Sequence, residues 1–397
     1  MKTVALAFRY LWSRPLAAVL NLLLLTLGLA SITFVVLASE QVSRSFQRNL
    51  AGIDLVVGAK GSPLQLILAG VFQIDVAPGN VPLAEIQALQ KHPQVASLVP
   101  LAMGDSFGGF RILGTTQDYL AQYGLRPVQG RSWEQPMEAV LGAQVAAASG
   151  LKSGGSFSGN HGLGGGGHAH GDAPYRVAGV LAPCGCVADR LILTGLESVW
   201  QLHEKAGHGD GKAHEDEREV TMALIRYTTP LAAVSFPRMV NTGTSMQAAA
   251  PAVEVTRLLR MLGVGSEALQ GLGVVLLVTA ALSVFIALWN AVRERREDLA
   301  MLRMLGATPL RVALLMLCEA LWLALLASLL GLGLGHGLTA LVGSLLAAQQ
   351  SLPLSGWTWV AQEIWIPVAA LGVAFVAALI PALSAARVDV AQLLNAR

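Results

Sequence analysis

Long apolar runs separate shorter mixed segments along this chain, and the longest runs have the length of membrane-spanning helices. The hydrocarbon core of a bilayer needs about 20 apolar residues in helical form. Four segments meet this requirement: 16–37, 268–289, a longer run over 312–348, and 365–386. The third run exceeds one upright span and is rich in glycine from Gly331 to Gly337. We therefore expect it to kink, to tilt or to pack closely against a neighbour.

The first run is expected to remain in the protein as an anchor. Lys2, Arg9 and Arg14 precede it, as basic residues precede a signal peptide. The apolar part of a signal peptide is usually about 7–15 residues long, and this run is longer. Leu37-Ala38-Ser39 is also a poor cleavage site.

The flanks of the four runs predict their orientation. Basic residues lie before the first run, between the second and third, and after the fourth, whereas residues 349–364 contain none. Cytoplasmic loops carry the excess of Lys and Arg, so we expect both termini and residues 293–311 in the cytoplasm. Residues 40–265 then lie outside, in the periplasm if the cell is Gram-negative, and the protein lies in the bacterial inner membrane.

Between the first two runs the pattern changes to short apolar strands and helices separated by Gly and Pro. Strands are expected at 54–57, 95–100, 109–114, 175–181, 191–193 and 220–227, and helices at 41–50, 83–91, 197–205 and 251–262. This mixture predicts an α+β domain. The expected fold class is an α-helical membrane protein with four transmembrane helices and a large α+β extracytoplasmic domain inserted between helices 1 and 2.

The predicted boundaries follow from these patterns. Residues 1–39 form the N-terminus and first span, 40–265 the outer domain, 266–292 the second span, 293–311 a cytoplasmic segment, 312–348 the third span, 349–364 a short outer loop, 365–386 the fourth span and 387–397 the C-terminus. Two segments, 154–173 and 205–219, have the composition of loops and contain most of the histidines.

Composition narrows the function classes. Hydrophobic residues make up 54% of the 397 residues and charged residues 13%, whereas soluble domains carry about 25% charged residues. This excludes a conventional soluble enzyme, and also disorder. A net charge of +2 argues against nucleic-acid binding. The chain has no HExxH or GxSxG motif, and Gly207–Lys212 departs from a phosphate-binding loop, so we expect neither catalysis nor ATP binding.

Six of the eight histidines fall in one stretch, close to many carboxylates: His161, His168, His170, His203, His208 and His214. Imidazole and carboxylate together suit zinc, copper or nickel, and His168 and His170 have a spacing that brings two rings to one ion. Flanking glycines would leave such ligands unorganised, and structural zinc sites need a closed shell. Functional metal capture and a solvated loop pair without metal both remain open.

Two further features carry possible chemistry. Cys184 and Cys186 are too close for an ordinary CxxC redox motif; a simple turn, a pair of bonded thiols and a soft-metal site are the alternatives. Glu319 lies within the third span, where a carboxylate is costly unless it is paired or faces water. Structural pairing is favoured over a proton relay, and we expect Asn21, Asn290 or His336 as its partner.

Residues 293–311 read as a short amphipathic helix followed by a turn. Leu299, Leu302 and Leu305 recur near helical spacing, and Gly306 is a natural helix end. Thr308 and Pro309 supply the cap and first turn of the next span. The segment either anchors at the membrane surface or docks a cytoplasmic partner.

Here the chain resembles the FtsX-like ABC transporter permease family, which includes MacB-type exporters and the lipoprotein-releasing LolC and LolE subunits. Residues 293–309 match the family's hallmark segment, Glu319 and the glycines that follow match its next span, and residues 387–394 match its C-terminal ending. Asp298-Leu299 departs from the usual Ile-Gly pair. The outer domain shows a looser similarity at residues 140–142, 150–154 and 175–183.

The resemblance implies a permease without a fused ATPase. A cytoplasmic ABC ATPase subunit, which binds ATP and Mg, would dock on Arg293, Arg295, Arg296, Glu297, Leu302, Leu305 and Gly306. A second permease, identical or a paralogue, would complete the transporter, and its cargo would be a lipoprotein, lipid, peptide or metal chelate. A periplasmic binding protein or lipoprotein and membrane lipids are further expected partners.

Two other functions remain as alternatives. The first is a regulator of an envelope hydrolase, driven by ATP hydrolysis elsewhere, and the second is a metal-handling membrane protein that uses the histidine-rich loops. Zinc or copper would be the bound metal in the second case.

Overall fold

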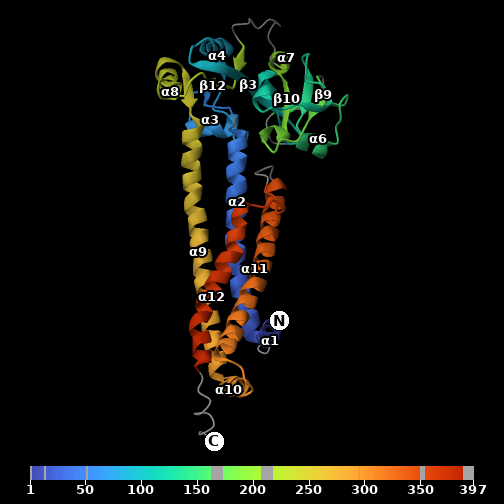
Figure 1. The fold of residues 1–397 in the computed structure, drawn as a ribbon. Coiled ribbons are helices and arrows are strands. Elements are labelled where there is room, and N and C mark those ends of the chain that lie inside the picture. Colours follow the sequence, from blue (N-terminus) through green and yellow to red (C-terminus); the bar gives the residue numbers. More distant parts are fainter. Residues whose placement is uncertain are drawn as a thin grey trace. The chain divides into compact units, whose positions relative to one another are not determined.

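The computed structural model describes residues 2–12, 15–50, 52–161, 173–206, 218–294, 296–348 and 354–387. The chain forms two compact units: a helical unit of residues 1–43 and 261–397, and an α+β unit of residues 44–260 (Figure 1). Two long helices, α2 and α9, belong to both units at their ends.

The helical unit contains the four predicted apolar helices. Its elements are α1 (Lys2–Leu11), α2 (Pro15–Asn49), α9 (Pro251–Glu294), α10 (Arg296–Met304), α11 (Pro309–Ala348), the short 3₁₀ turn η3 (Ala361–Ile364) and α12 (Trp365–Ala386). Among the described residues, four segments are long and apolar enough to cross a membrane: Ala18–Asn49, Gly271–Arg293, Pro309–Leu346 and Ala361–Ala386. The predicted fold class is confirmed.

Small residues bring these helices together. Ala370, Ala374 and Ala378 are buried along one face of α12, because residues four apart share a helix face. Leu25 and Leu29 of α2 pack in the same cluster. Small side chains let helix backbones approach closely, which is the usual basis of packing between apolar helices.

The glycine-rich part of α11 packs against α2, which is one of the three outcomes expected for this run. A Cβ on Gly331 would lie 2.7 Å from the Cβ of Leu29, and one on Gly335 would lie 2.5 Å from the Cβ of Thr33. Gly333 and Gly337 have open space at the same position. The sequence Gly-x-x-x-Gly therefore lines the contact with α2, and α11 is assigned as one helix from Pro309 to Ala348.

The α+β unit is built on one large sheet. Its described strands are β1 (Leu55–Ala59), β2 (Val81–Pro82), β3 (Val95–Phe107), β4 (Phe110–Thr115), β5 (Pro127–Gly130), β6 (Glu138–Leu141), β7 (Ser156–Phe157), β8 (Asn160–His161), β9 (Tyr175–Leu181), β10 (Leu191–Gly195), β11 (Glu219–Val220), β12 (Met222–Tyr227) and β13 (Met246–Ala249). The main strand order is β13-β1-β12-β3-β4-β10-β6-β9-β5, with β7 beside β9 and β8 beside β3. β11 and β2 form a separate pair.

Helices divide the sheet into two packed halves. The helices are α3 (Pro63–Gly70), α4 (Leu83–Gln90), α5 (Asp118–Gln122), α6 (Ala143–Ser149), η1 (Val187–Arg190), α7 (Leu196–Ala206) and α8 (Ala232–Gly243). One core gathers residues of β1, β12 and β13 with α4 and α8, around the fully buried Phe236. The other gathers β4, β6, β9 and β10 with α6, around Tyr175. The strand β3 belongs to both halves, and its register shifts between Met103 and Ser106.

The expected strands and helices are present in the α+β unit, but several further elements were not predicted, among them α3, α5, α6, α8, β5 and β13, and the segment 154–173, predicted as a loop, contains β7 and β8. Pro237 lies inside α8, and a proline within an apparent helix favours a break. The strand β13 has only four residues and no alternation of apolar and polar side chains.

Candidate functional site

A tight turn joins α10 to α11 at the predicted coupling segment. Gly306 has φ +94°, in the left-handed region that glycine adopts without a steric penalty. The N–H of Gly306 donates to the carbonyl of Arg303 at 3.1 Å, and that of Ala307 donates to Leu302 at 3.0 Å. This hydrogen-bond pattern is a Schellman motif. Pro309 then begins α11, so the sequence Leu-Gly-Ala-Thr-Pro fixes the reversal as predicted.

The end of α10 presents an apolar surface. Met301 and Met304 are each 56% exposed, and Leu305 is 81% exposed. We call these three residues the α10 apolar face. Leu302, which we predicted to dock the ATPase, is partly buried and packs against a cluster of the helical unit that includes Ala7 and Val312, and its role in docking stays a prediction. The two methionines were not among the predicted site residues, although flexible thioether side chains are frequent at adaptable binding surfaces.

The remaining predicted docking residues lie at the start of this segment. Arg293 is exposed in the last turn of α9. Arg296 and Glu297 belong to the first turn of α10, and their side chains lie outside the described part of the structure, as does the whole of Arg295. Their role in docking stays a prediction.

Glu319 is buried on α11, with 7% of its surface exposed. Two of its three expected partners contact other residues as well. Asn21 of α2 accepts a hydrogen bond from the Ser283 hydroxyl of α9 at 2.5 Å, which joins these two helices. Both ring nitrogens of His336 contact the loop that connects α11 to α12.

That loop is attached to two helices by side-chain contacts. The Gln41 amide of α2 donates to the Ser355 carbonyl at 2.9 Å and accepts from the Ser355 N–H at 2.7 Å. His336 Nδ1 lies 2.7 Å from the Gly356 carbonyl, and its Nε2 lies 2.9 Å from the Glu363 carboxylate. A Cβ on Gly356 would overlap the backbone of His336, so this close approach requires glycine.

In the α+β unit, Cys184 and Cys186 form a disulfide, which selects one of the three alternatives left open by the sequence. The Asp189 carboxylate accepts hydrogen bonds from the N–H groups of Cys184 at 2.9 Å and Gly185 at 2.7 Å. Asn49, the last residue of α2, accepts a hydrogen bond from the Val187 N–H at 2.8 Å. The end of this helix is thus bound to the disulfide loop.

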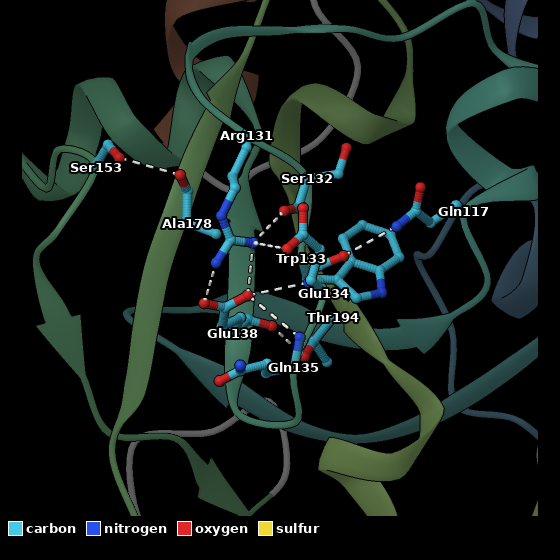
Figure 2. A network of polar contacts seen from close by, with 10 residues as sticks. All are labelled: Gln117, Arg131, Ser132, Trp133, Glu134, Gln135, Glu138, Ser153, Ala178 and Thr194. Carbon is cyan, nitrogen blue, oxygen red and sulfur yellow. Dashed lines mark hydrogen bonds and ion pairs between the residues drawn. The ribbon is translucent and has the colours of Figure 1, made fainter.

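An ion pair joins the residue after β5 to β6 in the same unit (Figure 2). Arg131, which follows β5, donates from both terminal nitrogens to the two oxygens of Glu138 on β6, at 2.8 and 2.6 Å. The N–H groups of Glu134 and Gln135 donate to the same carboxylate. The Arg131 hydrogen bond, aided by these N–H groups, lowers the pKa of Glu138 to about 2. Every contact here serves to position the chain, so we assign the network a structural role.

The predicted metal ligands are only partly within the described structure. His161 is the last residue of β8 and stands opposite Asp105 in the register of β3. His203 lies in α7, while His168, His170, His208 and His214 lie outside the described residues. Among the described residues, no group of three or more His, Cys, Asp or Glu side chains could hold a metal ion. Metal binding by the six histidines stays a prediction.

Comparison with known families agrees with this architecture. The profile of the MacB-like periplasmic core domain matches residues 18–254, and that of the FtsX-like permease C-terminal region matches residues 271–390. Because the first covers more than half of the chain, the protein belongs to the MacB-like and FtsX-like family of ABC transporter permeases. The α+β unit is therefore a domain of the periplasmic type.

Two solved structures resemble part of the chain. The periplasmic region of MacB from Actinobacillus actinomycetemcomitans is 14% identical, with 54% of this chain and 95% of that chain covered and a TM-score of 0.36. The extracellular domain of the ABC-type transporter YknZ from Gram-positive bacteria is also 14% identical, with 49% and 98% covered and a TM-score of 0.31. A comparison with curated proteins finds no match.

Proposed function

We propose that this chain is the permease subunit of an ABC transporter and that a separate cytoplasmic ATPase docks on the segment from Arg293 to Gly306. The observation that carries the proposal is the α10 apolar face, which is exposed next to a basic segment in a chain of this family. Exposed apolar side chains rimmed by polar residues are typical of protein interaction sites. The preformed turn at Gly306 would present this face without an ordering cost.

ATP hydrolysis on the partner would be coupled to movement of the periplasmic-type domain. Two permeases, identical or paralogous, would together move a lipoprotein, lipid, peptide or metal chelate outside the inner membrane. The continuous helix α2, from Pro15 to Asn49, supports this mechanism because it joins an apolar span directly to the α+β unit. The distribution of basic residues supports the placement of that unit in the periplasm.

Substitution of the α10 apolar face tests the docking. Leu305→Asp with Met304→Asp removes exposed apolar surface, and neither residue belongs to a buried cluster. We expect wild-type protein purified from its native membranes to retain an ABC ATPase with vanadate-sensitive ATP hydrolysis, and the double variant to lose at least about 90% of it, since central interface residues often contribute 2 kcal/mol or more.

A matched control places aspartate on another exposed apolar surface. Leu231 and Val234 of the α+β unit are 78% and 81% exposed, so Leu231→Asp with Val234→Asp introduces the same charge without touching α10. Equal ATPase retention by the two double variants would contradict the proposed docking site. Leu302→Asp is unsuitable here, because Leu302 packs against the helical core.

A further inference from the structure

His336 on α11 contacts two oxygen atoms of the loop before α12, an arrangement that membership of the family does not explain. Both nitrogens of the His336 ring face oxygen atoms: Nδ1 the Gly356 carbonyl at 2.7 Å, and Nε2 the Glu363 carboxylate at 2.9 Å. The second carboxylate oxygen accepts a hydrogen bond from the Val360 N–H at 2.9 Å. The two His336 contacts join α11 to the loop that precedes α12, and the Val360 contact holds the Glu363 carboxylate within that loop.

Counting hydrogens shows that this arrangement needs an additional proton. A carbonyl oxygen and an ionised carboxylate only accept hydrogen bonds, and a neutral imidazole carries one N–H. If Nδ1 carries it, the lone pair of Nε2 faces the Glu363 anion. If Nε2 carries it, the lone pair of Nδ1 faces the Gly356 carbonyl. Both contacts are satisfied only when the ring is an imidazolium or when Glu363 is a carboxylic acid.

Burial makes the proton necessary for the contact. The side chains of His336 and Glu363 are 16% and 2% exposed, and an ionised carboxylate at such a place is costly without a cation or a donor. The surrounding elements offer few other charges. His336 is the one titratable residue of α11 from 331 to 348, Glu363 is the one in 354–364, and α12 has none. On α2, Glu40 adjoins Gln41, which binds this loop.

We propose that His336 and Glu363 form a proton-binding site, in which one shared proton holds the loop of residues 354–364 on α11. Loss of the proton leaves a lone pair of the ring facing either the Glu363 anion or the Gly356 carbonyl, so one of the two contacts opens and the loop is released from α11. The bound proton thus stabilises the closed loop, and removal of the proton at higher pH removes this stabilisation. The loop carries Trp357 and Trp359, which are 91% and 73% exposed, so its release would move a prominent aromatic surface.

The protonation state can be measured directly on the full chain in lipid nanodiscs. Nitrogen NMR of ¹⁵N-histidine protein, with the His336 signals identified by their loss in His336→Gln, reports which ring nitrogens carry hydrogen. Infrared spectroscopy of ¹³C-glutamate protein, compared with Glu363→Gln, reports whether Glu363 is an acid. At about pH 7 we expect an imidazolium, or a neutral ring with N–H at Nδ1 and a protonated Glu363. A neutral ring together with an ionised Glu363 would overturn the proposal.

Hydrogen exchange of residues 354–364 over about pH 6 to 10, corrected for intrinsic exchange rates, tests whether the loop is released from α11 when the proton is lost. In the wild type we expect protection to fall about tenfold as the proton leaves, the loss expected for a buried charge-assisted hydrogen bond. The amide of Glu363→Gln can donate to Nε2 and accept from Val360, so this variant should stay protected throughout. Gln41→Ala, the control, should lower protection at every pH and keep the pH-dependent step. Identical pH profiles for the wild type and Glu363→Gln would refute the site.

Discussion

Replacing Gly331 or Gly335 by alanine tests whether the glycine pattern of α11 creates the contact with α2. A Cβ at these positions would lie 2.7 Å from Leu29 Cβ and 2.5 Å from Thr33 Cβ. Carbon atoms in favourable contact are about 3.5–4.0 Å apart, so either methyl group must push the two helices apart by about 1 Å. Thr33 cannot turn away easily, because its hydroxyl donates to the Leu29 carbonyl at 2.8 Å and the residue is fully buried.

Overpacking of this kind costs about 1–3 kcal/mol at each site. Alanine also favours the helix over glycine by about 1 kcal/mol, and this gain would partly hide the cost. Gly333→Ala and Gly337→Ala separate the two effects, because a Cβ there meets no atom within 4 Å. We expect these two controls to be neutral or slightly stabilising, and Gly331→Ala and Gly335→Ala to lower the free energy of unfolding relative to them.

The assay is reversible unfolding of the full chain in mixed micelles with increasing SDS, followed by far-ultraviolet circular dichroism. All four variants make the same glycine-to-alanine change on the same helix. Effects of this change on the unfolded state therefore cancel when their free energies of unfolding are compared. If all four variants unfold at the same SDS fraction, the glycines do not set the distance between α11 and α2.

Two further predictions concern the α+β unit. Glu138→Gln should lower the thermal midpoint of this unit at neutral pH by roughly 2–4 °C. The wild type should lose the same stabilisation as the pH falls from 4.5 toward about 2, because a lowered pKa of Glu138 stabilises the fold only while the carboxylate is ionised. If the variant loses stability with acid as the wild type does, the ion pair does not provide this stabilisation. Deletion of residues 162–170 removes His168 and His170. If the histidine-rich loops capture metal, this variant should bind zinc or copper more weakly in calorimetry. Unchanged binding would show that these two histidines do not bind the metal.

Local features of the sequence were sufficient for the spans and for the turn after α10. Each depends on residues close together in the chain: an apolar run of bilayer length, or Gly306 followed by Thr308 and Pro309. The direction of individual side chains was less predictable. Leu302 and Leu305 share a helical period, yet Leu302 packs inward and Leu305 is 81% exposed, because the position of α10 against the other helices decides which side is covered.

Contacts between distant segments were the least predictable. Glu363 is 27 residues from His336 and lies in a loop whose path depends on Gly356 and Gln41, so the sequence offered His336 only as one of three possible partners of Glu319. The disulfide of Cys184 and Cys186 was one alternative among three, since spacing alone does not exclude a turn or a metal site. Asn49 gave no signal at all, because a polar residue at a helix end is usually exposed to solvent.

The proposed coupling requires a stiff connection between the apolar spans and the α+β unit. An α-helix transmits displacement along its axis because its backbone hydrogen bonds run parallel to that axis, and α2 is one helix from Pro15 to Asn49. A helix can transmit displacement to a domain only if its end is held by contacts with that domain. Asn49 meets this condition, since its side chain accepts from Val187 and its carbonyl accepts from the Tyr123 hydroxyl at 2.9 Å. These contacts hold the end of α2 against the half of the sheet that carries the Arg131–Glu138 network, and the chain continues from Asn49 into β1 of the other half, which begins at Leu55.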